Sequence, residues 1–406
     1  MVAKLFIVLQ QKTYYLSYSN LERTELINNT STFIWDEFFS NDKMCFHAVY
    51  HSYEGLQGKV FIAFGDDGQI GPVVVNGNRA DTCRASIITH PLWQKFKIFQ
   101  FTKNLRLLGI QNSLDFNDQN DVDYYERQLR YSNILAEVRI GNKFSIDVQQ
   151  YHTETTSGIT KIRLPSMKFL TDTTNALTFL YPGNFHTPNL HQRAILCATN
   201  NDVDEWNSKV QALNPEQAIT FTARNEFSDI DDPKHILKSL FTDDACMFYK
   251  QNGVPDHQIT LKKGDICFVM RTLNRKEKLS NNTRVVVREM YRYSIKVETI
   301  SNNPKMFLIP RIRFKVKLRF GGFEIIRTQF PLRLAYAMTK NKSQGQNIPF
   351  SLNDIRNPPF SHGHLYVSMS RATDVDQVCF YCHEDQVEEN AIVVDNVVYP
   401  EMMLLI

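Results

Sequence analysis

The chain has 406 residues, of which 43% are hydrophobic, and this length is enough for two to four domains with sizeable cores. No apolar run approaches the roughly 20 residues that a membrane-spanning helix needs, so we expect no membrane partner. The net charge of only +3 argues against a protein that binds nucleic acid through its overall charge, and any basic groove must be local.

Short apolar runs that end in polar residues recur along the chain and predict strands of parallel sheets. Leu5–Leu9 is too short for the core of a signal peptide and predicts a buried strand instead. Strands are also predicted at Phe33–Trp35, Val60–Phe64 and Ala194–Ala198, and the spacing of apolar residues predicts a helix at Asp121–Ile140. Parallel sheets bind ligands outside the carboxyl ends of their strands, so the polar residues that follow these runs are the first candidates for a functional site.

The pattern changes between about residue 253 and residue 330, where short β-rich runs are separated by turn residues. The predicted strands are Ile266–Met270, Arg284–Val287, Ser294–Val297 and Arg313–Leu318, with turns at Asn281-Asn282 and Gly321-Gly322. This pattern predicts a small β-barrel inserted into an α/β domain. After the insertion, Leu365–Met369 predicts the start of a helix near the last strands.

Seven cysteines, an odd and scattered set, indicate free thiols in a reducing compartment. Two of them stand in Cys379-Phe380-Tyr381-Cys382-His383, which matches a haem-attachment pattern and half of a zinc site. No second pair of ligands stands at a spacing that would complete a tetrahedral zinc site. Val378–Tyr381 also has the pattern of a buried strand, in which free cysteine behaves as a small hydrophobic residue, and we prefer this structural interpretation.

Candidate chemistry begins at Asp36-Glu37, directly after the predicted strand Phe33–Trp35. An acidic pair at a strand end can hold magnesium and align an attacking water in a nucleotide hydrolase, although such a pair is more often a solvated turn. Gln69 ends a second polar turn, where an amide can sense a terminal phosphate, and Arg106 follows a third apolar stretch with a side chain suited to phosphate oxygens. Each residue taken alone could have a purely structural role, whereas their order and spacing together indicate one site.

Two motifs near the C-terminus place further polar side chains at the mouth of a buried sheet. The first is Met338–Gln346, which contains Lys342-Ser343-Gln344-Gly345, and the second is Leu365–Thr373, which contains Ser370-Arg371. A lysine, a glutamine and an arginine at the mouth of a sheet are what a nucleotide-driven motor requires.

Together these motifs resemble those of superfamily 1B DNA helicases, specifically the Pif (petite integration frequency) family and its relatives in Helitron transposons. Asp36-Glu37 is similar to motif II, Gly65-Asp66-x-x-Gln69 to motif III and Thr102-x-Asn104-x-Arg106 to motif IV. Met338–Gln346 and Leu365–Thr373 are similar to motifs V and VI. Other blocks follow in the family's order, and the resemblance extends from about residue 30 to near the C-terminus.

The resemblance implies a role in ATP hydrolysis for five of these residues. Asp36 would coordinate magnesium through water, and Glu37 would polarise the attacking water. Gln69 would contact the terminal phosphate and couple it to DNA. Arg106 and Arg371 would face the phosphates, one from each RecA-like lobe.

Motif V is implied to connect the nucleotide to DNA. Lys342 and Gly345 would belong to the nucleotide site, whereas Ser343 and Gln344 would contact single-stranded DNA. The cofactors implied are ATP and Mg²⁺, and the implied partner is single-stranded or forked DNA. Trp35 and Trp93 also have rings that could stack on bases, but their apolar neighbours predict core packing instead.

The fold implied by the resemblance is α/β, with two RecA-like parallel-sheet domains, the first of them incomplete, and a small inserted β-barrel. The expected boundaries are an atypical N-terminal segment at 1–30, the incomplete first domain at 31–165, the second domain at 166–252 and 331–406, and the β-rich insertion at 253–330. The expected activity is that of an ATP-dependent 5′→3′ DNA helicase, with family roles in DNA repair, recombination and telomere maintenance. A nuclear location is expected from the family and a mitochondrial one stays open, because no clear targeting signal is present.

The chain departs from the family's pattern at several points. Asp67-Gly68 replaces Phe-Arg within motif III, the bulky Phe38 replaces an alanine after the acidic pair, and Lys340 stands where an apolar residue is common. No G-x-x-x-x-G-K-[ST] phosphate loop occurs in the sequence. Only some thirty residues precede Asp36, too few for the strand, loop and helix that normally come first, so we expect an N-terminally truncated member of the family.

Two functions therefore stay open at this point. The chain is either an ATP-dependent DNA helicase that is represented here by a truncated sequence, or a catalytically inactive, transposon-derived remnant that at most binds single-stranded DNA. A phosphate-loop exon in frame upstream would support the first function, and stop codons there would support the second.

Overall fold

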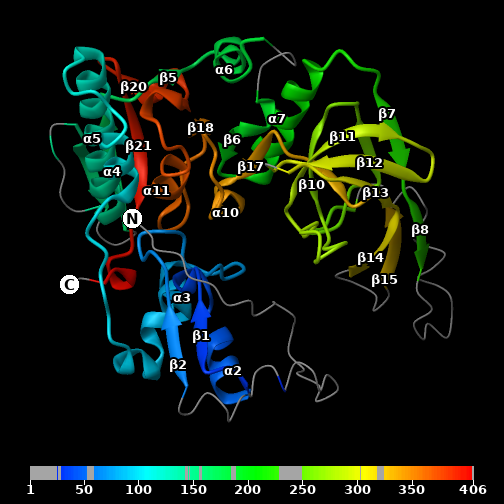
Figure 1. Ribbon diagram of the computed structural model, residues 1–406, viewed down its shortest axis with the longest axis horizontal. Coiled ribbons are helices and arrows are strands. Elements are labelled where there is room, and N and C mark those ends of the chain that lie inside the picture. Colours follow the sequence, from blue (N-terminus) through cyan, green and yellow to red (C-terminus); the bar gives the residue numbers. More distant parts are fainter. Residues whose placement is uncertain are drawn as a thin grey trace. The chain divides into compact units, whose positions relative to one another are not determined.

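The structure is a computed structural model with two compact units. It describes residues 29–52, 59–141, 147–154, 158–183, 189–227, 249–301, 303–317 and 324–404, together with Glu25 and Ser145. Unit 1 comprises Met1–Asp172 and Thr339–Ile406, and unit 2 comprises Thr173–Met338 (Figure 1). The predicted strand Leu5–Leu9, the predicted turn Gly321-Gly322 and most of the predicted segment 1–30 lie outside the described residues.

Two strands and the turns after them place the acidic pair in unit 1. β1 (Thr32–Trp35) and β2 (Val60–Ala63) pair in parallel, with Phe33 opposite Phe61, so the predicted strands at these positions are confirmed. Parallel pairing brings the carboxyl ends of β1 and β2 to the same edge. Asp36 and the turn that starts at Gly65 therefore leave the sheet side by side.

A second group of strands in unit 1 forms its largest core. β18 (Phe350–Asp354), β19 (Val378–Tyr381) and β5 (Phe169–Leu170) pair in parallel in that order. An antiparallel sheet has the order β20 (Val387–Glu388), β21 (Ala391–Val397), β4 (Ile159–Leu164) and β3 (Gln149–Glu154). Apolar side chains of these strands pack with those of two helices, including Tyr131, Ile134, Leu365 and Met369.

The described residues of unit 1 include the α-helices α2 (Lys43–Ser52), α3 (Arg79–Ala85), α4 (Leu105–Gln111), α5 (Gln119–Ile140), α10 (Lys340–Ser343) and α11 (His364–Met369). The predicted helix at Asp121–Ile140 is confirmed as α5. Its first turn is capped by the Asp118 carboxylate, and it ends at Gly141, whose φ of 71° lies in the left-handed region that favours glycine. None of the described helices has both the length and the apolar character needed to span a membrane.

Unit 2 begins with α6 (Thr173–Leu180), β6 (Arg193–Cys197) and α7 (Asn200–Ala212). All five residues of β6 are buried, as the predicted apolar run at Ala194–Ala198 requires. Thr199 and Asp202 form a capping box that starts α7 directly after this strand. Inside the same unit, the Arg284 side chain donates hydrogen bonds to the carbonyl oxygens of three residues, His191, Arg193 and Ala335.

The β-rich part of unit 2 consists of antiparallel sheets. The largest has the order β13 (Met306–Pro310), β12 (Ser294–Thr299), β11 (Arg284–Met290), β10 (Ile266–Val269) and β16 (Leu332–Leu334). The others are β14 (Ile312–Lys317), β15 (Glu324–Gln329) and β8 (Arg224–Phe227), and β7 (Ile219–Thr222) with β9 (Gln258–Leu261). β17 (Ala337–Thr339) follows at the boundary of the two units. The predicted strands of this region are confirmed, but its described strands form three separate sheets rather than a closed barrel.

Candidate active site

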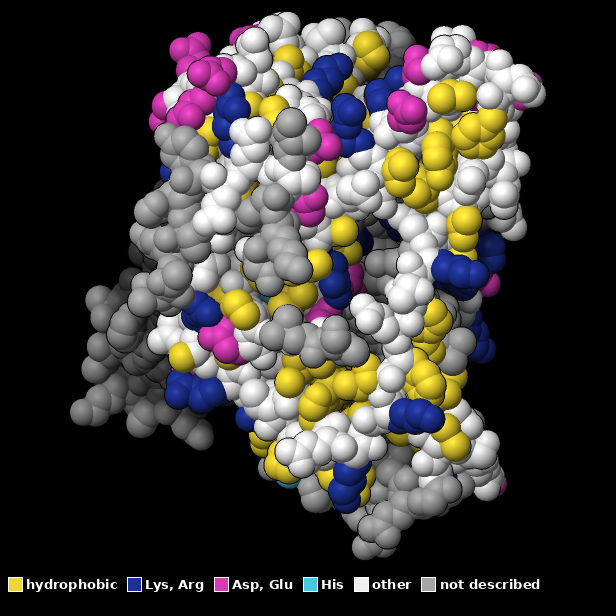
Figure 2. Space-filling model, turned by 90° about the vertical axis from the view of Figure 1, so that its left-hand side faces the viewer, with side chains coloured by type: hydrophobic (Ala, Val, Ile, Leu, Met, Phe, Trp, Pro, Cys, Tyr) yellow, Lys and Arg dark blue, Asp and Glu magenta, His cyan; other side chains and the backbone are white. Residues whose placement is uncertain are grey.

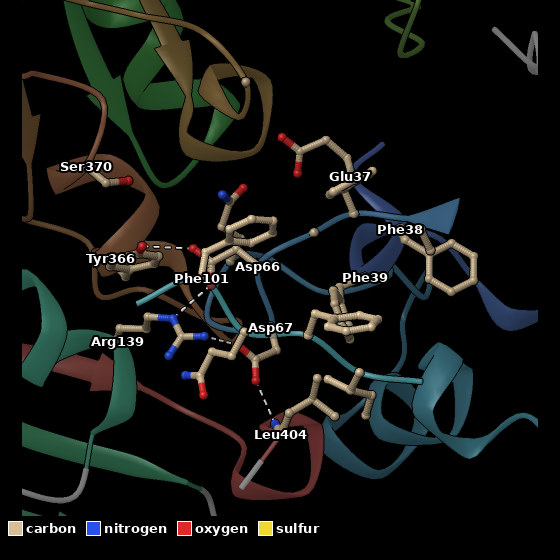
Figure 3. A pocket seen from close by; sticks show the side chains of 18 of the residues that line it. Glu37, Phe38, Phe39, Asp66, Asp67, Phe101, Arg139, Tyr366, Ser370 and Leu404 are labelled. Carbon is tan, nitrogen blue, oxygen red and sulfur yellow. Dashed lines mark hydrogen bonds and ion pairs between the residues drawn. The ribbon is translucent and has the colours of Figure 1, made fainter. Parts of the chain in front are cut away.

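All nine residues that the sequence nominates for a site belong to unit 1. That unit contains a cavity of about 1300 Å³, which is lined by Glu37, Gln69, Arg106, Gly345 and Arg371 together with many aromatic residues. Figure 3 shows Glu37 with three of these aromatic residues, Phe38, Phe39 and Phe101. Asp36, Lys342, Ser343 and Gln344 are not among the residues that line it. The nominated residues span most of the sequence, and folding brings the majority of them to one place.

Glu37 follows β1 with an unusual backbone conformation. Its φ of 54° and ψ of 42° lie in the left-handed region, which non-glycine residues rarely occupy. Neighbouring groups hold this conformation: the Asp36 Oδ1 accepts a hydrogen bond from the Glu37 amide at 3.0 Å, and the Glu37 carbonyl oxygen accepts hydrogen bonds from Ser40 and Asn41. Backbone strain of this kind often occurs at functional sites.

A glutamine from motif V contacts both motif II and motif III. The Gln344 Nε2 donates to Gln69 Oε1 at 3.1 Å and lies 3.5 Å from Glu37 Oε2. The carboxylate proposed to act on water and the amide proposed to sense phosphate therefore share one neighbour, which comes from a segment about 300 residues away in the sequence. The shared contact joins the three motifs in one place.

The two nominated arginines meet at Ser370. The Arg106 guanidinium lies 3.4 Å from the Ser370 carbonyl oxygen, and the Arg371 guanidinium donates to Ser370 Oγ at 2.9 Å and to the Val367 carbonyl oxygen. Arg371 is buried, and this burial lowers its pKa from the usual range, with the nearby Arg106 charge acting in the same direction and Glu37 opposing it. An arginine stays protonated at neutral pH despite such a shift, so two cations face the cavity.

The remaining residues of motif V take different positions. Lys342 is exposed on α10, whereas Ser343 is fully buried and its hydroxyl donates to the Lys340 carbonyl oxygen at 2.7 Å. Gly345 has a φ of 74°, and a Cβ built on it would lie 3.9 Å from Glu37 Oε1. The backbone at Gly345 is thus close to the acidic pair, while the side chain of Ser343 faces the interior of unit 1.

The turn that carries Gln69 is held by residues that the sequence did not nominate. Asp66 is buried and accepts hydrogen bonds from the Tyr366 hydroxyl at 2.8 Å, from Arg139 Nε at 2.8 Å and from the Gly68 amide at 3.0 Å. Burial alone would raise the pKa of Asp66, but the charge of Arg139 and the donated hydrogen bonds outweigh it and lower that pKa below its usual value. Asp66 is therefore a structural anion at the base of the turn.

His362 and Gly363, which directly precede α11, support the same turn. The His362 Nδ1 accepts a hydrogen bond from the Tyr399 amide at 3.0 Å, so its Nε2 carries the proton and donates to the Asp67 carbonyl oxygen at 2.7 Å. Burial lowers the pKa of His362, which keeps the ring neutral in this arrangement. Gly363 has a φ of 74°, and a Cβ there would come within 2.5 Å of the Gly68 carbonyl oxygen. The sequence singled out this block, and its role in the structure is to support the turn.

Phe38, the bulky residue after the acidic pair, is the centre of an aromatic cluster. It is buried, and its ring lies 5.4–5.9 Å from the rings of Trp35, Phe46, Phe61 and Phe96. Trp93 also packs against this cluster, so the predicted core packing of both tryptophans is confirmed. The departure from alanine thus fills the space beside the short β1–β2 sheet.

Part of the cavity wall is apolar and open to solvent. Phe99 and Phe101 line the cavity with 72% and 55% of their surface exposed, and the Lys97 ammonium lies 5.1 Å from the centre of the Phe99 ring. Figure 2 shows groups of hydrophobic side chains on one face of the molecule, interspersed with lysine and arginine. Such a surface offers both ring faces and positive charge to a ligand.

The cysteine motif has a structural explanation. Cys379 and Cys382 are buried, and Cys379 lies within β19, as the strand interpretation predicts. Burial raises the pKa of Cys379 to about 12 and that of Cys382 to about 11, so both are protonated thiols at neutral pH. In the part of the chain that the structure describes, no three histidine, cysteine or acidic side chains gather as metal ligands would.

Comparisons with known proteins point to one family. The family model of the PIF1-like helicases matches residues 10–146. The ATP-dependent DNA helicase Pif1 of Campylobacter jejuni is 38% identical over 94 residues, which is 21% of each chain, and the ATP-dependent DNA helicase PIF1 of Xenopus laevis is 26% identical over 201 residues, which is 45% of this chain and 29% of the relative. The chain thus matches less than a third of the length of either curated relative.

Solved structures give the same result for the fold. The Pif1 helicase from Candida albicans has a TM-score of 0.54 at 16% identity, with 89% of this chain and 74% of that chain covered. Bacteroides Pif1 bound to single-stranded DNA has a TM-score of 0.56 at 17% identity, with 98% and 76% covered. The RecA-like α/β fold predicted from the motifs is therefore confirmed. Together with the sequence matches, these findings show that the chain has the fold of the Pif1 helicases and is similar to the PIF1-like helicases over residues 10–146.

Proposed function

We propose that this chain acts in ATP-dependent DNA unwinding, with Glu37 as the residue that polarises the attacking water. The observation that supports this proposal most directly is the contact of Gln344 with both Gln69 and Glu37, beside a cavity that also receives Arg106 and Arg371. A phosphoryl-transfer site needs an acidic group for water and fixed cations for the developing charge, and this cavity has both.

The same residues fit ATP and Mg²⁺. Asp36 and Glu37 are adjacent carboxylates, which suit a hard cation held partly through water, and the two arginines suit phosphate oxygens. When bound, Mg²⁺ would neutralise charge on the phosphates. Gln69, held by Gln344, would then report the state of the terminal phosphate to motif V.

Single-stranded or forked DNA is the proposed partner. Structures of relatives with similar folds include Bacteroides Pif1 bound to single-stranded DNA and two Pif1 helicases at forked DNA. Motif V is the proposed link between nucleotide and DNA in this chain. Because the Ser343 hydroxyl is buried and already bonded, we assign the contact with DNA to Gln344 and the backbone around it.

The absence of a phosphate-loop motif from the sequence favours a second candidate, a protein that binds single strands without hydrolysing ATP. A phosphate loop holds the β- and γ-phosphates with backbone amides and a lysine. Loss of a single preorganised donor lowers turnover by roughly 10²–10³-fold, so we expect the 406-residue chain by itself to hydrolyse ATP far more slowly than a helicase does.

ATP hydrolysis with and without single-stranded DNA would separate the two functions. The assay uses the 406-residue chain, the same chain with the phosphate-loop segment of a close relative fused to its N-terminus, and Glu37→Gln in both. We expect the fusion to gain at least about 100-fold in turnover and to lose it on Glu37→Gln. A fusion without activity that still binds single strands would favour the second candidate. Rapid hydrolysis by the unfused chain, abolished by Glu37→Gln, would show that another element holds the phosphates.

Binding to DNA can be tested apart from hydrolysis. Fluorescence anisotropy with labelled single-stranded oligonucleotides should give weak affinity that falls steeply as salt rises, because lysine and arginine contacts with phosphates release counterions. Equal affinity at low and moderate salt would contradict a contact with the DNA backbone.

A further inference from the structure

The turn Gly65–Gln69, which resembles motif III, carries Asp67 and Gly68 where the motif that it resembles has Phe-Arg. In the structure a cation reaches this turn from elsewhere: Arg139, in the last turn of α5, forms ion pairs with both Asp66 and Asp67 (Figure 3). The Asp66 and Asp67 side chains are 3% and 6% exposed, and that of Arg139 is 25% exposed. Two nearly buried carboxylates thus share one guanidinium, which can donate in two directions.

Gly68 provides the room for this arrangement. A Cβ built on Gly68 would come within 2.2 Å of Arg139 Cγ and 2.9 Å of its Cδ. Any side chain at this position would therefore push the stem of Arg139 away from the turn. The two departures from the family's motif III, Asp67 and Gly68, are both explained by the position of Arg139.

α5 is a rigid support for this arginine. Earlier along the helix, Ser132 accepts a hydrogen bond from Asn104 of motif IV at 2.8 Å, and the Tyr131 hydroxyl donates to the Met369 carbonyl oxygen at 2.8 Å. The same helix thus contacts motif IV, the end of α11 next to Arg371, and the turn of motif III. A group held on a helix with several fixed contacts can position a neighbour accurately.

We propose that Arg139 is a positioning residue of the ATP site: its two ion pairs fix the Asp66–Gln69 turn and so hold the Gln69 amide against Gln344. This inference rests on the proposed function for its effect on hydrolysis. Arg139 lines the cavity, but its guanidinium is engaged by two carboxylates of the turn, so it acts through the turn.

The first test measures the turn itself by amide hydrogen exchange. The Gly68 amide donates to Asp66 Oδ1 and the Gln69 amide to the Asp66 carbonyl oxygen at 3.1 Å. In the full chain, Arg139→Ala should speed exchange of these two amides at least tenfold, and Arg139→Lys should have a smaller effect because one charge remains. Arg130→Ala is the matched control, because Arg130 also lies on α5 and pairs with an acid, Asp147, at 3.5 Å. Unchanged exchange in Arg139→Ala would overturn the proposal.

The second test separates positioning from binding. In the full chain and in the phosphate-loop fusion, Arg139→Ala should lower kcat at least tenfold while KM for ATP stays within about twofold, and Arg139→Lys should restore part of kcat. A raised KM with unchanged kcat would mean that Arg139 binds the nucleotide directly, and unchanged kinetics would remove its role in hydrolysis; either result overturns the proposal. If neither parent chain hydrolyses ATP, the proposed function fails, whereas amide exchange still decides whether Arg139 fixes the turn.

Discussion

Replacing Tyr366 by phenylalanine tests whether Asp66 is a buried charge that needs all its donors. The Tyr366 hydroxyl donates to Asp66 Oδ2 at 2.8 Å, and both side chains are buried. Hydrogen bonds to charged groups contribute about 1.5–3 kcal/mol, so Tyr366→Phe should lower the free energy of unfolding by that amount. Tyr131 is the matched control, because it is equally buried and its hydroxyl also donates at 2.8 Å, but to the neutral carbonyl of Met369. Tyr131→Phe should therefore cost only about 0.5–1.5 kcal/mol.

Guanidinium unfolding followed by tryptophan fluorescence would measure both variants, since Trp35 and Trp93 report on the aromatic cluster of unit 1. The pH dependence gives a second criterion. The pKa of Asp66 is lowered in the folded chain, so the stability that its partners contribute is present above the unfolded value of about 3.9 and is lost as the pH falls through the folded value. The two variants should become more alike in acid. Equal costs at pH 7, or a cost below about 0.5 kcal/mol for Tyr366→Phe, would refute the assignment of Asp66 as a buried anion.

Three further substitutions test other parts of unit 1. Gly363→Ala should lower the free energy of unfolding by at least about 2 kcal/mol, because the left-handed φ of Gly363 and its contact with the Gly68 carbonyl oxygen exclude a Cβ. Gly109→Ala should raise the free energy of unfolding by about 0.5–1 kcal/mol, because Gly109 lies in a helix with open space around it. Thermal unfolding measures both variants, and a stable Gly363→Ala or a destabilised Gly109→Ala would contradict the respective prediction. Phe38→Ala should lower the free energy of unfolding by about 3–5 kcal/mol, although alanine is the residue of the motif that this segment resembles. A decrease below about 1 kcal/mol in a denaturant titration would show that the aromatic cluster is not tightly packed. Burial lowers the pKa of His364 to about 3. As the pH falls from 6.5 to 3, this group should therefore lower the free energy of unfolding of the wild-type chain by up to about 1.4 kcal/mol per pH unit. His364→Leu should flatten that part of the curve of stability against pH, and an unchanged curve would contradict the prediction.

Much of the site was predictable because the motifs mark strand ends. The apolar runs before Asp36 and Gly65 gave β1 and β2, and their parallel pairing explains why two distant turns are neighbours. The contact between Glu37 and Gln344 was not predicted, because the resemblance assigns Gln344 to DNA and no local pattern relates residues so far apart in sequence. The fold class followed from the same resemblance.

The supporting residues were not predictable in this way. Arg139 stands in the last turn of α5, where an arginine is common because it complements the helix dipole, so its position carries no signal of a tertiary role. His362 belongs to a recognisable block, but its partners, the Asp67 carbonyl and the Tyr399 amide, are backbone groups that any sequence would supply. The sequence pattern also could not determine whether the strands close into a barrel, because alternating residues predict strands and not the pairing of the last strand with the first.

The conformation of Glu37 places backbone strain at the residue that we propose to act on water. A left-handed backbone costs a non-glycine residue roughly 1–2 kcal/mol, and here the Asp36 carboxylate, Ser40 and Asn41 hold it in place. Glycine would relieve that strain, so Glu37→Gly should leave a protein that is no less stable and is inactive. On the proposed function, Glu37 is therefore a position where a carboxylate is kept at a cost in stability.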